Sequence, residues 1–168
     1  MTTVELLVTG LHFIRAGVRA IEPVLEEIIM QAEKEIHMIA YIITPSALPI
    51  LNLIEKAVAK GVKFTMVVNN LQSQNTIIVS KLNSIMERFP HVRIVDFTDP
   101  ENGQLHAKVV IADRRRAVIG SANLSWGGMY SNHEIGLLVE GEVAWKLAEI
   151  IDSLCVSIGW RQEHRCRE

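Results

Sequence analysis

The chain contains the run His106-Ala107-Lys108-Val109-Val110-Ile111-Ala112-Asp113 and, seven residues after its end, Gly120-Ser121-Ala122-Asn123. Val and Ile favour strands. The polar segment Asp113–Arg116 then interrupts the apolar residues, and a second apolar run follows. Two strand-like runs around a short polar segment predict a β-hairpin with the arms Leu105–Ala112 and Ala117–Gly120.

This hairpin would gather chemically useful side chains at one of its ends. Alternate residues of a strand point to the same face, so His106 and Lys108 project together. The return arm brings back three small or polar residues beside them: Gly120, Ser121 and Asn123. Asp113 lies at the other end, about 20 Å away at about 3.3 Å per strand residue. We therefore expect Asp113 to have a structural role. Gly120, which has no side chain to contact a substrate, is also expected to be structural.

Such a cluster suits phosphodiester transfer. A neutral His106 imidazole can attack phosphorus and form a covalent intermediate. Lys108 and the Asn123 amide would hold the non-bridging oxygens, where negative charge builds in the transition state. A second histidine would protonate the leaving oxygen. Glu134 could accept a hydrogen bond from the other ring nitrogen of His106. Because lysine and amide donors replace a metal ion in this scheme, we expect neither metal nor cofactor.

The spacing H-x-K-x(4)-D-x(6)-G-S-x-N resembles the HKD motif of the phospholipase D superfamily. The resemblance is strong over Leu105–Glu140 and weaker over Val24–Val95, where a βαβ pattern is shared by many α/β proteins. It implies these roles: His106 as nucleophile, Lys108 and Asn123 as phosphate ligands, Ser121 as a supporting donor, Glu134 as the polar partner of the histidine, and Asp113 as a structural residue.

The motif occurs once in this chain, whereas family members with two copies build one site from both. The resemblance therefore implies that a second histidine comes from elsewhere. A symmetric homodimer supplies it simply, because a twofold axis at the active site places His106 opposite its own copy. The alternative is a heteromeric partner that carries another motif.

Outside the motif, apolar periodicity predicts alternating strands and helices. Strands are expected at Val4–Val8, Glu35–Ile43, Val62–Val68, Val92–Phe97 and Glu134–Val139. Helices are expected from Glu22-Pro23 to about Lys34 and at Ala47–Lys60, Gln72–Phe89 and Val143–Ile158, and Thr9–Ala20 is expected to be a connection with a helical turn. This order predicts an α/β fold with a mixed, largely parallel sheet flanked by helices on both faces.

Length and composition narrow the class of protein. The 168 residues predict a single domain, residues 1–168, and the net charge of −2 argues against binding nucleic acid by bulk electrostatics. The N-terminus lacks the pattern of a signal peptide, and no apolar stretch is long enough to span a membrane, so a cytoplasmic protein is expected. Cys155 and Cys166 show neither metal-ligand spacing nor a disulfide framework.

Other residues allow two interpretations each. Arg114–Arg116 fits a solvated turn better than a nucleic-acid patch. Asn69–Asn75 is a polar loop that either caps a helix or borders the cleft. Trp126 or Tyr130 could stack on a base, cover an acyl chain or pack internally. Three histidines outside the motif are expected to be structural: His12, His37 and His91.

The motif specifies a phosphodiester but not which one. Short single-motif chains resemble bacterial endonuclease-type members of the family, so a nuclease acting on DNA or RNA is favoured. A phospholipase D or phosphatidyltransferase, or an inactive nucleic-acid-binding module, is the alternative. A nuclease predicts a basic, aromatic-edged groove, and a lipid enzyme predicts an exposed apolar rim. The N-terminal half is also similar to phospholipase-D-like components of bacterial anti-phage defence systems, which implies a possible partner protein.

Overall fold

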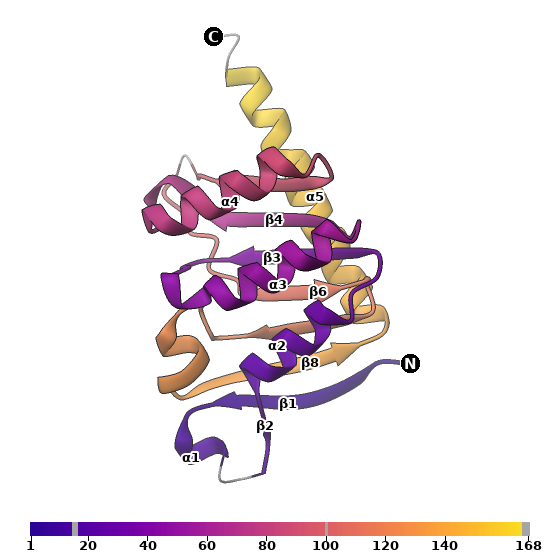
Figure 1. Cartoon of the computed structure of the whole chain (residues 1–168). Helices are drawn as coiled ribbons and strands as arrows, with labels where there is room; N and C mark the ends of the chain where they lie inside the picture. Colours follow the sequence, from indigo (N-terminus) through magenta and orange to yellow (C-terminus); the bar gives the residue numbers. More distant parts are fainter. Residues whose placement is uncertain (15–16, 100, 166–168) are drawn as a thin grey trace.

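A mixed β-sheet forms the centre of the fold. The computed structural model describes residues 1–14, 17–99 and 101–165. Within them, eight strands lie side by side in the order β2-β1-β8-β7-β6-β3-β4-β5 (Figure 1). In chain order the strands are β1 (Thr3–Thr9), β2 (Arg19–Ala20), β3 (Glu35–Ala40), β4 (Lys63–Asn69), β5 (Val92–Phe97), β6 (Val109–Ala112), β7 (Arg116–Gly120) and β8 (Glu134–Glu140).

The mixed sheet confirms the expected fold class, but its parallel part is smaller than expected. Among the described strands, β1–β2, β3–β4 and β4–β5 pair in parallel. The other four neighbouring pairs are antiparallel. Parallel neighbours need a long crossover connection, usually a helix, whereas short connections give antiparallel neighbours. Helical crossovers join β3, β4 and β5, while β6 and β7 enter the sheet as a hairpin.

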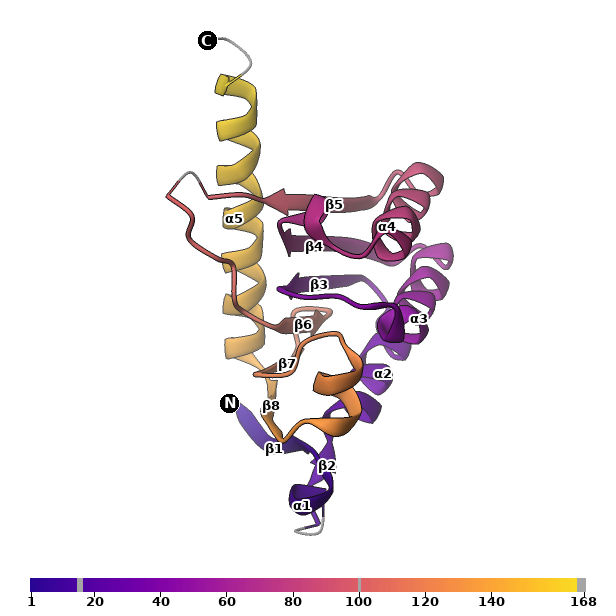
Figure 2. The ribbon, with the colours of Figure 1, turned by 90° about the vertical axis from the view of Figure 1, so that its left-hand side faces the viewer.

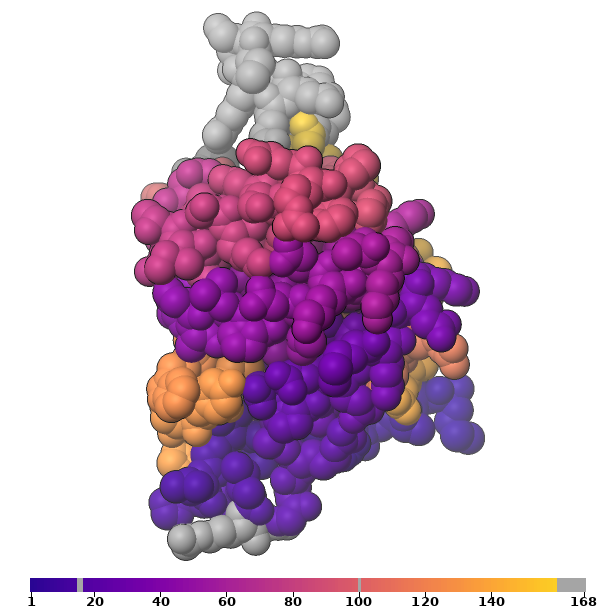
Figure 3. Space-filling view, in the orientation of Figure 1, coloured from indigo at the N-terminus to yellow at the C-terminus, as the bar shows by residue number. Residues whose placement is uncertain are grey.

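Helices cover both faces of the sheet, as predicted. The helices are α1 (Leu11–Ile14), α2 (Ile21–Met30), α3 (Leu48–Ala59), α4 (Thr76–Arg88) and α5 (Glu142–Arg165). Figure 2 shows α2, α3 and α4 on one face and α5 on the other, and Figure 3 shows the first three filling the face turned toward the viewer. Met38 packs in the core beneath α2–α4, and the next residue, Ile39, packs in the core beneath α5. Burial on both faces explains why the β3 sequence is apolar almost throughout.

Several predicted boundaries differ from the structure. Strand β3 ends at Ala40 rather than Ile43, α2 at Met30 rather than about Lys34, and α5 at Arg165 rather than Ile158. The short strand β2 lies in a segment predicted to be a connection.

Strand β6 begins at Val109 rather than Leu105, because its register with β7 starts at the pair Val109–Ile119 and residues 102–108 have no strand conformation. In the helix predicted from Gln72, the segment Leu71–Ser73 forms a 3₁₀ turn, and α4 begins at Thr76. The Asn75 side chain accepts a hydrogen bond from the Ile77 N–H at 3.0 Å and so caps α4.

Cys155 is buried within α5, as its place in the apolar pattern indicates. Cys166 lies outside the described residues. Across the described parts of the chain, no helix combines the length and apolar character needed to cross a membrane.

Candidate active site

The sheet topology brings the motif residues to one edge. His106 and Lys108 directly precede β6, Ser121 and Asn123 follow β7, and Glu134 begins β8. Because β6–β7 and β7–β8 are antiparallel, the start of β6, the end of β7 and the start of β8 share an edge. Figure 2 looks onto this edge, from which residues 101–108 extend on the α5 side. The predicted cluster therefore forms even though residues 105–108 are not in the strand.

Lys108 lies directly against His106. Its Nζ is 2.8 Å from His106 Nδ1 and donates to the His106 carbonyl oxygen at 2.7 Å. Burial lowers the pKa of Lys108, and the negative charge of Glu134 partly opposes this. The same Nζ also lies 3.4 Å from His106 Nε2, so either ring nitrogen can accept from the ammonium group, depending on the tautomer of His106.

Tyr41 is a member of this site that the sequence interpretation missed. It follows β3 immediately, and its ring centroid lies 4.2 Å from that of the exposed His106 ring. Lys108 Nζ is 5.2 Å from the Tyr41 ring centroid, within the range of a cation–π interaction. The available sequence signal was its position at the end of a buried strand, where ligand-binding residues gather in α/β sheets.

Glu134 is held by neighbours other than His106. Its carboxylate accepts hydrogen bonds from Ser121 Oγ and, at 3.0 Å, from Asn132 Nδ2. Ser121 Oγ in turn accepts a bond from the Ile135 N–H at 3.3 Å. Within one chain, Glu134 is thus tied to the end of β7, and its expected hydrogen bond to His106 stays a prediction.

Asn123 is fixed by the turn that follows it. Its side-chain oxygen is buried and has no hydrogen-bond partner among the described residues. A π-helical turn, Gly127–Ser131, packs against its backbone so closely that a Cβ on Gly128 would lie 2.2 Å from the Asn123 carbonyl oxygen. π-Helical turns occur frequently at functional sites, and a catalytic role is one explanation for an unsatisfied buried polar atom.

The same turn carries an exposed aromatic pair. Trp126 is 63% exposed, and its ring centroid lies 4.6 Å from that of Tyr130. The Tyr130 hydroxyl donates to Glu22 Oε1 at 2.9 Å. This bond, followed by burial, raises the pKa of Tyr130. Tyr130 is therefore anchored to α2. The Trp126 indole packs against the Tyr130 ring and is exposed to solvent.

Asp113 occupies the far end of the hairpin, as expected. Its carboxylate accepts hydrogen bonds from three successive backbone N–H groups, those of Glu33, Lys34 and Glu35, at 2.9, 2.7 and 3.0 Å. Burial raises the pKa of Asp113, but the three donors outweigh burial and the net pKa is lowered. Gly120 is also structural, because a Cβ there would lie 2.7 Å from the Ile135 carbonyl oxygen on β8.

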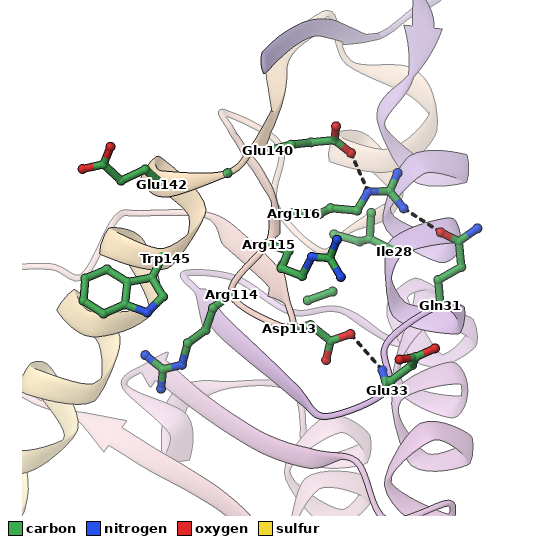
Figure 4. Close-up of a pocket in the computed structure, with 12 residues that line it drawn as sticks. Ile28, Gln31, Glu33, Asp113, Arg114, Arg115, Arg116, Glu140, Glu142 and Trp145 are labelled. Carbon is green, nitrogen blue, oxygen red and sulfur yellow. Dashed lines mark hydrogen bonds and ion pairs between the residues drawn. The ribbon is translucent and has the colours of Figure 1, made fainter. Parts of the chain in front are cut away.

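The three arginines beside Asp113 line a hollow of about 580 Å³, which Figure 4 shows together with Trp145. Arg114 forms ion pairs with Glu35 and Asp152, and Arg116 forms ion pairs with Glu27 and Glu140. Both guanidinium groups are only partly exposed, so the expected solvated turn describes Arg115 better than Arg114 and Arg116. Their charges are also engaged within the chain, which argues against a nucleic-acid patch here.

The remaining histidines divide into two groups. His37 is buried, with Nε2 3.1 Å from Asp152 Oδ1, and His91 Nε2 lies 3.0 Å from the Val58 carbonyl oxygen. These two are structural, as predicted. His12 instead stacks on His133, next to Glu134 in the chain, with ring centroids 5.2 Å apart. Across the described residues, no group of three or more His, Cys, Asp or Glu side chains could hold a metal ion.

Comparison with known proteins identifies one matching family. The family described as "Cardiolipin synthase, PLD-like domain" matches residues 25–155. A segment of 38 residues is 55% identical to the DISARM protein DrmC of Bacillus paralicheniformis. That segment spans 23% of this chain and only 16% of the relative, so most of the relative's length is not matched.

Solved structures show the same fold over nearly the whole chain. NucT from Helicobacter pylori matches with a TM-score of 0.74 and 18% identity, covering 94% of this chain and 98% of its own. The phospholipase D family member Nuc from Salmonella typhimurium matches with a TM-score of 0.71 and 20% identity, covering 91% and 93%. At these identities the likeness establishes the architecture alone.

Proposed function

Because this chain belongs to the phospholipase D-like family, as the match over residues 25–155 shows, we propose that its site cleaves phosphodiesters without a metal ion. The specific activity we propose is that of an endonuclease acting on DNA or RNA through a covalent phosphohistidine. The observation that carries this proposal is the convergence of His106, Lys108 and Asn123 at one sheet edge. We further propose that the chain forms one catalytic domain with one copy of the motif.

In the proposed reaction, a neutral His106 ring attacks phosphorus, and the bond to the leaving oxygen breaks. Lys108 and the Asn123 amide stabilise the charge on the non-bridging oxygens. Lys108 must first move away from the His106 ring, because its Nζ lies within hydrogen-bond distance of both ring nitrogens. An incoming phosphate would draw it away and oppose the desolvation that lowers its pKa. Water then hydrolyses the phosphohistidine and regenerates His106.

A second histidine must protonate the leaving oxygen, and we propose that a second copy of this chain supplies it. The α5 side of β1 and β8 supports this proposal, because Leu6 pairs with Leu137 and Val8 with Ile135 in register. Three of these side chains are large, apolar and exposed: Leu6, Ile135 and Leu137. Ile135 directly follows Glu134, so this apolar surface adjoins the site. Exposed apolar patches of this kind mark interaction surfaces.

Nucleic acid is the substrate that the aromatic edge favours. Trp126 stands exposed on an anchored Tyr130, on the turn that packs against Asn123. Bases of single strands stack on such aromatic side chains. The similarity of a 38-residue segment to a DISARM protein supports a defence role with a partner protein. The sequence also predicts that the nucleic-acid groove is basic, and we propose that the dimer forms this basic groove.

A lipid phosphodiester is the second candidate. The family match carries the name of cardiolipin synthase. Ile42, which follows Tyr41 at the site edge, is also exposed, as is Trp126. These two side chains fit the apolar rim predicted for a phospholipase or phosphatidyltransferase. An inactive nucleic-acid-binding module would have the same fold without turnover.

The deciding experiment is cleavage of labelled single- and double-stranded DNA and RNA in EDTA, comparing the unmodified protein with His106→Asn. We expect metal-independent cleavage that the substitution abolishes, together with a covalent adduct trapped by rapid denaturation of the unmodified protein in detergent at alkaline pH, where phosphohistidine is stable. Cleavage of phospholipid vesicles but of no nucleic acid would establish the lipid alternative. Nucleic-acid binding without turnover, unchanged in His106→Asn, would establish the inactive module.

A further inference from the structure

Residues 102–108, which carry His106, have little regular structure of their own to hold them. Just before His106, the Leu105 N–H donates to Asn69 Oδ1 at 2.8 Å. Asn69 Nδ2 donates to Gln104 Oε1 at 2.9 Å. Asn69 is the last residue of β4 and is only 4% exposed. The buried Asn69 side chain thus forms hydrogen bonds to Gln104 and Leu105, which immediately precede the proposed nucleophile His106.

Gln74 links Asn69 to Tyr41, the residue whose ring contacts His106. Its Nε2 donates to the Asn69 carbonyl oxygen at 2.8 Å and to the Tyr41 carbonyl oxygen at 2.9 Å. Its Oε1 accepts from the Ile43 N–H at 2.9 Å. The backbone that carries Tyr41 and the chain that carries His106 are therefore both tied to Asn69 and Gln74.

The chemistry of these contacts requires amides. Asn69 donates and accepts at the same time, and Gln74 makes two donations and one acceptance. A carboxylate can only accept, and an alkyl side chain can do neither. A buried polar group left without its partner is destabilising, so loss of either amide would favour a rearrangement of the backbone that it holds.

We propose that Asn69 and Gln74 are positioning residues that hold His106 against Tyr41 in the geometry needed for attack on phosphorus. This inference rests on the proposed phosphodiesterase function. It adds two residues from outside the motif, which act through Leu105 and Tyr41 and do not touch the substrate. A displacement of about 1 Å at a reacting group can cost about a hundredfold in rate.

The test compares Asn69→Ala with Asn75→Ala. Both substitutions remove an Asn side chain from the same segment, but Asn75 caps α4 and makes no bond to Leu105 or Tyr41. The first measurement is the NMR chemical shift of the His106 ring protons, which the Tyr41 ring displaces at a centroid distance of 4.2 Å. The second measurement is kcat and KM on the substrate that the unmodified protein cleaves.

We expect Asn69→Ala to abolish the Tyr41-dependent shift of His106 and to lower kcat by about 10- to 100-fold with little change in KM. Asn75→Ala should lower the melting temperature while leaving the His106 shift and kcat unchanged. Gln74→Glu should behave like Asn69→Ala, because it places a carboxylate against two carbonyl oxygens.

An unchanged His106 shift in a folded Asn69→Ala protein, with kcat no lower than in Asn75→Ala, would overturn the positioning role. If the unmodified protein cleaves nothing, the proposed function fails, and the NMR comparison alone decides whether Asn69 orients His106. Should Asn69→Ala fail to fold, Gln74→Glu is measured in its place.

Discussion

At the scale of single residues, the contact between Lys108 and His106 connects protonation to substrate binding. The Lys108 ammonium lies within hydrogen-bond distance of both ring nitrogens of His106, and burial lowers the pKa of Lys108. A phosphate at the site would favour the charged lysine and release the ring nitrogen. In the tautomer with its proton on Nδ1, His106 can then donate that N–H to a carboxylate, and the lone pair of Nε2 is free to attack phosphorus. The proposed reaction therefore uses two positions of Lys108: against the His106 ring in the free protein, and on the phosphate when substrate is bound.

The role of Trp126 is also a question of one side chain. We expect Trp126→Ala to weaken binding of single-stranded DNA or RNA by about 5- to 150-fold, since one base–aromatic stack contributes about 1–3 kcal/mol. Trp126→Phe should restore most of the affinity, because the ring is retained. Fluorescence anisotropy with labelled oligonucleotides measures both. Equal affinity in all three proteins would instead favour a role in packing, and loss of vesicle binding alone would favour a lipid substrate.

At the scale of secondary-structure elements, the hairpin turn between β6 and β7 depends on Asp113. Asp113 and Arg114 both have positive φ angles, 53° and 55°, which non-glycine residues seldom adopt. The three hydrogen bonds to residues 33–35 tie this turn to the start of β3. The ion pairs of Arg114 tie it also to α5 through Asp152. The turn thus joins three elements at the end of the sheet opposite His106.

Asp113→Asn tests this arrangement through pH as well as stability. We expect it to lower the free energy of unfolding by about 1–3 kcal/mol at neutral pH, since Asn cannot accept all three bonds. The folded-state pKa of Asp113 is lowered, so its contribution is fully present above the unfolded-state pKa, about 3.9. It disappears as the pH falls through the folded-state value. Urea denaturation at several pH values measures the difference between the two proteins.

Arg115→Ala is the matched control, because Arg115 is exposed in the same turn. It should change stability by no more than about 0.5 kcal/mol at any pH. A difference between Asp113→Asn and the unmodified protein that stays constant down to about pH 2 would contradict the assigned ionisation.

At the scale of the whole molecule, the proposed dimer predicts that one surface governs both assembly and activity. Ile135→Lys should give a folded monomer in sedimentation experiments and lose most activity, because the second histidine is removed with the partner. Ile77→Lys makes the same change at an equally exposed residue of α4, on the other side of the sheet, and should remain dimeric and active; both residues are 54% exposed. An active Ile135→Lys monomer would refute the composite site.

The sequence alone determined the main elements of the fold and the identity of the motif residues. Apolar periodicity and the polar break at Asp113 located the strands, the helices and the hairpin, because these depend on neighbouring residues. The same local signals placed Asp113 away from His106. They could not show where β6 begins, because that depends on pairing with β7 rather than on the apolar content of Leu105–Ala112.

Only the tertiary structure decided what surrounds the motif. Tyr41 contacts the His106 ring, and Asn69 and Gln74 contact the backbone beside it, from segments far away in sequence. Their positions at or after the ends of buried strands suggested a place near the cleft, but no local pattern shows which partners they bind. They meet because β3 and β4 run in parallel beside β6, so that their carboxyl ends and the start of β6 lie at one edge. Side-chain hydrogen bonds and ring contacts depend on ångström-scale geometry across strands. That geometry is set by packing of the whole sheet, and not by residue spacing.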